Sequence, residues 1–210
     1  MDPHLRAGIA VYNAGEHHAA HDAWEDRWLD LESGSGDERF LHGLIQFTAA
    51  VHHGHEGNVP GLRGLAESAT EYLAGLPSPY RGVDLDSIRS YLTGLAANPE
   101  EFEPTEVPVL RYEGRALDLA DLAADGDFEA AAIAADVLTE EYDAYEEAVI
   151  ETGIAHARES IEAGEGGRFV ALVFDFVAGK RRDLVYQRLR EHVERRRTRD
   201  ADVEGLFDPE

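Results

Sequence analysis

The segment of residues 38–54 constrains the fold more strongly than any other part of the chain. It reads ERFLHGLIQFTAAVHHG, and its apolar side chains fall on almost every side of a helix. A helix that is apolar on all sides needs neighbours around its whole circumference. The segment therefore predicts a helix in the middle of a bundle, and hence an all-α protein in which other helices surround it.

Start and stop signals divide the first hundred residues into five helices. Asp2-Pro3, Asp37 and Asn58 have the residue types that begin helices, and Gly15 suits the position after a helix end. We expect helices over residues 2–13, 16–31, 38–54, 58–75 and 85–97. Together they form a predicted helical bundle over residues 1–98.

The second half of the chain has a different character. A proline-rich acidic stretch, PEEFEPTEVP, begins at residue 99, and VLRYEGRAL alternates around Glu113-Gly114 as a small β-hairpin does. We predict a linker over residues 99–126 that can hold this one hairpin. Helical patterns return over residues 127–163 and 168–199, so residues 127–210 are predicted to be a helical extension that packs on the bundle or on a second subunit.

The charge of the chain indicates where it works. It has 43 acidic and 19 basic residues, a net charge of −24, and a single lysine, yet 43% of its residues are hydrophobic, too many for a disordered acidic chain. A folded protein of this charge repels itself in dilute salt, whereas molar salt shrinks the Debye length to about 3 Å. We interpret the acidity as halophilic adaptation to a salt-rich cytoplasm, and nucleic-acid binding by the acidic body is disfavoured.

Several kinds of site and segment are missing from the sequence. There is no cysteine, so any metal must be bound by His, Asp, Glu or water. No apolar run approaches the about 20 residues of a transmembrane helix, and the N-terminus lacks the pattern of a signal peptide. We therefore expect a cytoplasmic protein with no membrane partner.

The arginine-rich segment of residues 180–199 stands out against the acidic chain. It holds nine basic and three acidic residues. Such a segment can bind nucleic acid, but the nearest anions are the protein's own, so we favour docking on the acidic body or on a second subunit. The apolar stripe of this segment needs a partner surface, which a homodimer would supply. It consists of Leu184, Tyr186, Leu189 and Val193.

The stretch HDAWEDRW, residues 21–28, carries the main candidate site. On a helix His21, Glu25 and Trp28 lie on one stripe, at positions i, i+4 and i+7. His21 and Glu25 can then meet the same ion, with His53 from the end of the next helix as a third ligand. This would be a set of two histidines and one carboxylate with open positions for water or substrate. Gln46 or His17 would be a fourth ligand or support the first three.

A second interpretation of the same residues is structural. His21 and Glu25 can pair with each other, and Gln46 or His53 can complete a hydrogen-bond network that fixes the register of the helices without any chemistry. The protein would then be a non-catalytic binding or assembly module. From the spacing alone both interpretations stand, because the pattern H-x-x-x-E is common on helices.

The first hundred residues resemble DUF309, a family of unknown function. The marker H-x-x-x-E-x-x-W/Y is matched by His21, Glu25 and Trp28, and Gly-Leu-Ile-Gln by residues 43–46. Further matches are His53 and the run Gly57, Asn58 and Gly61. The resemblance implies a divalent metal, such as Zn, Fe, Mn or Ni, on the His/Glu motif, with no reaction established. Members usually have Glu directly after the motif histidine, where this chain has Asp22, which has a shorter reach.

Overall fold

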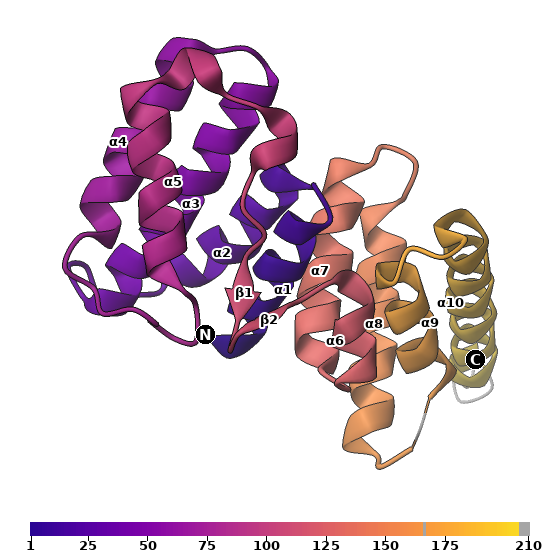
Figure 1. Ribbon diagram of the computed structural model, residues 1–210. Coiled ribbons are helices and arrows are strands. Elements are labelled where there is room, and N and C mark those ends of the chain that lie inside the picture. The colour runs from indigo at the N-terminus through magenta and orange to yellow at the C-terminus, as the bar shows by residue number, and fades with distance from the viewer. Residues whose placement is uncertain (166, 206–210) are drawn as a thin grey trace.

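A computed structural model describes residues 1–165 and 167–205, the last six of these by their helical backbone. The described part is helical except for one two-stranded sheet and its loops, so the predicted all-α class is confirmed (Figure 1). The first half holds α1 (Asp2–Asn13), α2 (His17–Leu29), α3 (Gly36–His55), α4 (Val59–Leu73) and α5 (Leu85–Ala97). The second half holds α6 (Leu119–Ala124), α7 (Phe128–Glu141), α8 (Glu147–Glu162), α9 (Arg168–Val177) and α10 (Arg182–Gly205).

The apolar helix α3 lies in the middle of the first half, as its sequence predicts. It packs on α2 along one side and on α4 along another. Its side chains Phe40, Leu41, Leu44 and Phe47 are fully buried. Their burial removes large apolar areas from water, which is the main force that holds the surrounding helices in place.

Helices α1 and α2 approach each other closely at Gly8. A Cβ atom at this position would lie 2.1 Å from Nε1 of Trp24, which is fully buried. The indole N–H of Trp24 points toward the carbonyl oxygen of Leu5 at 3.5 Å. Trp24 is therefore a core residue that sets the distance between the two helices.

The caps of the helices agree with the sequence in part. The side chain of Asn58 accepts a hydrogen bond from the backbone N–H of Gly61 at 3.1 Å, as predicted. The predicted cap Asp37 is wrong: Ser35 caps α3, accepting from the N–H of Glu38 at 3.1 Å. Asp37 lies within the first turn and instead accepts hydrogen bonds from Tyr80 and Arg81.

The predicted hairpin is present, and Asn13 holds it. Strands β1 (Arg111–Tyr112) and β2 (Arg115–Ala116) are joined by Glu113 and Gly114, both with positive φ, as a tight two-residue turn requires. The side-chain amide of Asn13 donates to the carbonyl oxygens of Leu110 and Leu117, at 2.9 and 2.7 Å, and its oxygen accepts from the N–H of Leu110 at 2.8 Å. An isolated two-stranded hairpin is only marginally stable in water. These hydrogen bonds stabilise it by anchoring it to Asn13 of α1.

The stretch between the two halves is more structured than the sequence indicates. Two 3₁₀ helices, η1 (Pro99–Glu101) and η2 (Pro104–Glu106), occupy the proline-rich acidic stretch. Helix α6 was not predicted; it is short, and Asp118 and Asp121 form a reciprocal capping box at its start. The pattern over residues 127–163 forms two helices, α7 and α8, and that over 168–199 forms α9 and α10.

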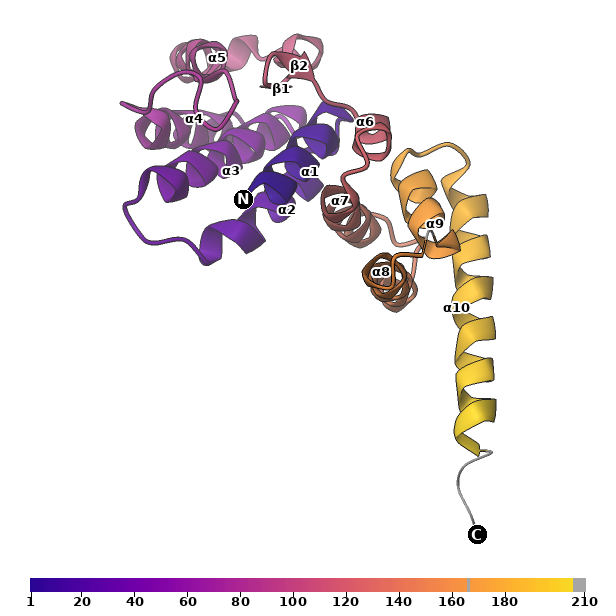
Figure 2. The same ribbon diagram turned by 90° about the horizontal axis from the view of Figure 1, so that it is seen from below.

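Helices α7 to α10 form a second group, in which α7 lies against α1 and α2 (Figures 1 and 2). Helix α10 extends beyond the other helices toward the C-terminus (Figure 2). In the apolar stripe of α10, Tyr186 and Leu189 are buried. Leu189 packs so closely on Gly153 of α8 that a Cβ atom added to this glycine would lie only 2.8 Å from the leucine side chain. The stripe therefore has a partner surface within the chain, and a homodimer stays a prediction.

None of the described helices is long and apolar enough to cross a membrane.

Candidate metal centre

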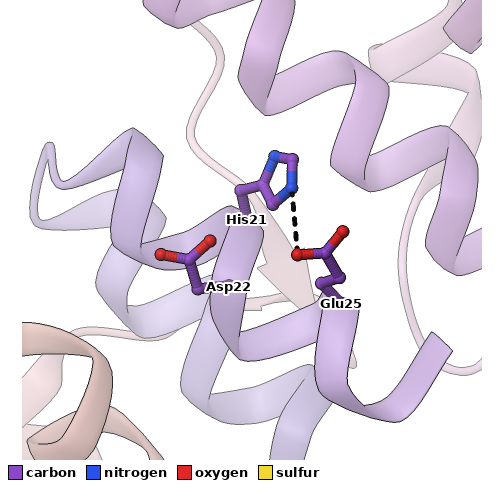
Figure 3. A group of neighbouring side chains, drawn as sticks. All are labelled: His21, Asp22 and Glu25. Carbon is purple, nitrogen blue, oxygen red and sulfur yellow. Dashed lines mark ion pairs between the residues drawn. The ribbon is translucent and has the colours of Figure 1, made fainter. Parts of the chain in front are cut away.

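Helix α2 has one apolar and one polar side, which fixes where its functional groups lie. Its buried side consists of Ala19, Ala20, Ala23 and Trp24. The small alanines let α1 and α3 approach, and the polar side is left facing outward. That side carries His18, His21, Asp22 and Glu25 (Figure 3 shows the last three).

His21, Asp22 and Glu25 form a compact group of metal-ligating atoms. One nitrogen of His21 and one carboxylate oxygen each from Asp22 and Glu25 lie within 4.8 Å of one another. The dashed line in Figure 3 joins Nε2 of His21 to Oε2 of Glu25, which are 3.7 Å apart. All three residues are partly buried. The predicted pair of His21 and Glu25 thus has a third candidate ligand, Asp22, from the same turn.

The donor set fits a divalent cation. Ligand atoms at about 2.1 Å from an ion are at most about 4.2 Å apart, so the His21–Glu25 distance already suits a shared ion. The remaining distances are at most 4.8 Å, a little above this limit, and the side chains keep contact with solvent. One imidazole and two carboxylates are ligands that zinc, iron and manganese accept.

The carboxylate of Asp22 is in a strongly charged setting. Burial raises its pKa, His18 and His21 oppose this shift, and the carboxylates of Glu25 and Glu141 add to it. Nδ1 of His18 lies 3.5 Å from Asp22 and 3.1 Å from Oε2 of Glu141, which comes from the end of α7. A bound cation would relieve the repulsion between these acids.

His17 lies at the start of α2 in a drier setting. Its ring stacks on that of His55 at 5.0 Å and contacts Tyr12 at the same centroid distance. Burial, followed by the nearby His55 and His52, lowers the pKa of His17 to about 4. His17 is therefore neutral at pH 7, and its ring lines a cavity of about 260 Å³ beside Pro108 and Val109.

Two of the predicted partners make no hydrogen bond or ion pair with His21 or Glu25 among the described residues. Nδ1 of His53 is 3.0 Å from the side-chain nitrogen of Asn58 and 3.4 Å from Glu56, and His53 is outside the compact group formed by the described residues. Gln46 is only half-buried, and its side chain makes no hydrogen bond within the part of the chain that the structure describes. The predicted role of His53 as a ligand stays a prediction.

The side chain of Trp28 is engaged with two residues of α3. Its indole N–H donates to Oε1 of Glu38 at 3.0 Å, and its ring lies 4.5 Å from that of His42. The hydrogen bond from Trp28 lowers the pKa of Glu38. The third motif residue therefore ties α2 to the start of α3 and keeps the polar side of α2 in place.

Sequence reasoning missed two residues near this group, His18 and Glu141. His18 is adjacent to the motif, and its i, i+4 spacing to Asp22 was a signal that could have been used. Glu141 is 123 residues from His18, and no local pattern indicates that they meet. His52 also approaches, with its ring 5.9 Å from that of His18.

The fold and the site together define an all-α protein with a His/Asp/Glu group on one helix. Residues 5–65 match the model of a family described as "Domain of unknown function (DUF309)", so the resemblance stated from the motifs is confirmed over this range. The matched segment contains most of α1, all of α2 and α3, and the start of α4. A similar protein from Aquifex aeolicus (strain VF5), described as uncharacterized, is 29% identical over 103 residues. These cover 49% of this chain and 31% of the relative, so the chain aligns with about a third of that protein's length.

Proposed function

We propose that the protein binds a divalent metal ion through His21, Asp22 and Glu25. The observation that carries this proposal is the convergence of one imidazole nitrogen and two carboxylate oxygens within 4.8 Å. Each of these side chains keeps contact with solvent, so an ion can enter. Zinc, iron, manganese and nickel are the candidate ions.

The chain's own residues would fix the position and charge of such an ion. His21 and Glu25 are one helical turn apart and hold the ion against α2, while Trp28 and Glu38 lock the end of that helix. A metal of this kind, when bound, acts as a Lewis acid on water or substrate at its open positions. His53 would be a further ligand if its side chain left Asn58.

The alternative function, a non-catalytic module with a structural hydrogen-bond network, has less support. That interpretation predicts that Gln46 or His53 completes the network with His21 and Glu25. The contacts of His53 are with Asn58 and Glu56 instead. The pair of His21 and Glu25 is also half-exposed, where an ion pair contributes about 0–1 kcal/mol.

We also propose that the protein works in a salt-rich cytoplasm. The net charge of −24 supports this, because screening by molar salt removes most of the repulsion between acids. Thermal unfolding in dilute buffer and in molar KCl tests it. A melting temperature that does not rise with salt would contradict the proposal.

Metal binding is tested with untagged, chelator-treated protein. Isothermal titration with Zn²⁺ or Mn²⁺ and elemental analysis after gel filtration should show bound metal in the unaltered chain. His21→Ala and Glu25→Gln should weaken binding at least tenfold, whereas His156→Ala should not. His156 is a matched control because it pairs with Glu159 at 3.3 Å on another helix. No binding by the unaltered chain, or equal binding by all variants, would contradict the proposal.

A further inference from the structure

Asp22 belongs to two groups of ligand atoms at once. On one side it lies with His21 and Glu25 (Figure 3). It also lies near His18, whose Nδ1 is 3.5 Å from Oδ2 of Asp22 and 3.1 Å from Oε2 of Glu141. A carboxylate has two oxygens, so Asp22 can bind one ion through each of them.

Glu141 is held at this place by contacts of the residue that follows it. The hydroxyl group of Tyr142 donates a hydrogen bond to Glu16 at the start of α2. The guanidinium of Arg182 lies 5.4 Å from the centroid of the Tyr142 ring, a cation–π contact. The end of α7 is thus fastened to the start of α2, and the carboxylate of Glu141 stays beside His18.

We propose that His18, Asp22 and Glu141 form a second divalent-cation site, and that the carboxylate of Asp22 bridges the two ions. This inference rests on the proposed function, which supplies the first ion. The ligands of the second site come from both halves of the chain, so it gives α7 a role in the chemistry of α2. Bridged metal pairs in enzymes are about 3.5–4 Å apart and can hold both oxygens of a displacement reaction.

His18 stands between the two carboxylates of the second site. Its Nδ1 is 3.5 Å from one oxygen of Asp22 and 3.1 Å from one oxygen of Glu141, inside the about 4.2 Å that separates opposite ligands of one ion. The two carboxylates are farther from each other, since among the described residues it is His21, Asp22 and Glu25 whose atoms all lie within 4.8 Å, so an ion at the second site draws Asp22 and Glu141 together. The side chain of His18 is 60% exposed, so it can rotate to let an ion enter between the carboxylates. The ring of His52, 5.9 Å from that of His18, is close enough to be recruited.

The local charge favours two ions over one. The carboxylates of Asp22, Glu25 and Glu141 together carry three negative charges, and Glu140 adds another within electrostatic range of Asp22. One divalent ion leaves part of this charge without a counter-charge. Two divalent ions offset all of it, and they replace the weak pairing of His18 with two acids.

The metal stoichiometry of the full chain tests this inference. Chelator-treated protein is titrated with Mn²⁺, and the bound metal is counted by calorimetry and elemental analysis. The unaltered chain should bind two ions, His18→Ala and Glu141→Gln should bind one, and the control His156→Ala should bind two. Circular dichroism and the melting temperature of each metal-free variant confirm that it folds.

The outcomes separate this inference from the proposed function. Two ions in the unaltered chain and one in Glu141→Gln support the second site. One ion in both, or two in both, overturns it and leaves the first site standing, whereas no metal in any variant overturns both. Electron paramagnetic resonance of the Mn²⁺-loaded chain tests the bridge. An exchange-coupled pair, lost in Glu141→Gln, is expected, and two uncoupled signals would overturn the bridging role of Asp22.

Discussion

The two sides of α2 show how one helix can serve two purposes. On the buried side, Trp24 is enclosed and its neighbours are small alanines that permit close packing. On the polar side, His21, Asp22 and Glu25 bring their ligand atoms together without a full set of hydrogen bonds. Burial therefore marks the residues that hold the fold, whereas converging polar atoms that lack a full set of hydrogen bonds mark a candidate site.

The largest expected effect is on the buried side. Trp24→Ala removes a fully buried indole and leaves a cavity next to Gly8, so we expect a loss of about 3–5 kcal/mol in the free energy of unfolding. The melting temperature should fall by roughly 10 °C. The matched control Trp28→Ala, at a half-exposed position, should lose clearly less. Equal losses for the two tryptophans would show that the buried and polar sides of α2 do not differ in their contribution to stability.

Asn13 is polar, but both the nitrogen and the oxygen of its side-chain amide are hydrogen-bonded. Its replacement should therefore lower the stability of the protein, as the replacement of a buried residue does. Asn13→Ala leaves the backbone groups of Leu110 and Leu117 without their partner. We expect a loss of about 1–3 kcal/mol in chemical unfolding, and earlier proteolysis near the hairpin. A variant as stable as the unaltered chain, with an intact hairpin in its amide exchange, would show that other contacts hold β1 and β2.

His17 is more buried than the polar side of α2, and it should make the stability of the protein depend on pH. Burial lowers its pKa from 6.5 to about 4, so below pH 6.5 the unfolded chain binds a proton that the folded protein excludes. The stability contributed by neutral His17 is therefore complete above pH 6.5 and is lost as the pH falls toward 4. When the pH is lowered from 7 to 5, the free energy of unfolding of His17→Gln should fall by about 1 kcal/mol less than that of the unaltered chain, allowing for solvent screening. Equal losses would contradict the burial of His17.

The smallest effect on stability is expected at Glu25. Its carboxylate is 45% exposed and 3.7 Å from His21, so Glu25→Gln should change the stability of the metal-free protein by less than about 0.5 kcal/mol. Urea unfolding after chelator treatment measures this. A loss of about 2 kcal/mol or more would indicate a structural network and would favour the alternative function.

The parts of the site that could be predicted are those that depend on local geometry. His21 and Glu25 lie one turn apart on any helix, so their pairing follows from the sequence, as do the central position of α3 and the cap at Asn58. The place of His53 depends on a competing local partner, Asn58, which the same motif supplies. Glu141 reaches α2 only because α7 packs across it, and this contact depends on apolar packing between distant segments.

Two elements differ from what the sequence predicts, the cap of α3 and the helix α6. Asp37 and Ser35 both have side chains that can cap a helix, and distant Tyr80 and Arg81 decide between them by binding Asp37. Helix α6 is short, with Leu122 as its buried residue, so it leaves little periodicity in the sequence. For the cap of α3, contacts from far along the chain therefore outweigh a local preference.

The position of a bound metal tests the central claim most directly. Crystals of the chelator-treated protein soaked in Zn²⁺ or Mn²⁺, measured at the absorption edge of the metal, locate the ion by anomalous scattering. We predict an ion about 2.0–2.2 Å from an imidazole nitrogen of His21 and a carboxylate oxygen of Glu25, with Asp22 as its next ligand. An ion bound elsewhere, with His21 and Glu25 still paired only with each other, would contradict the account.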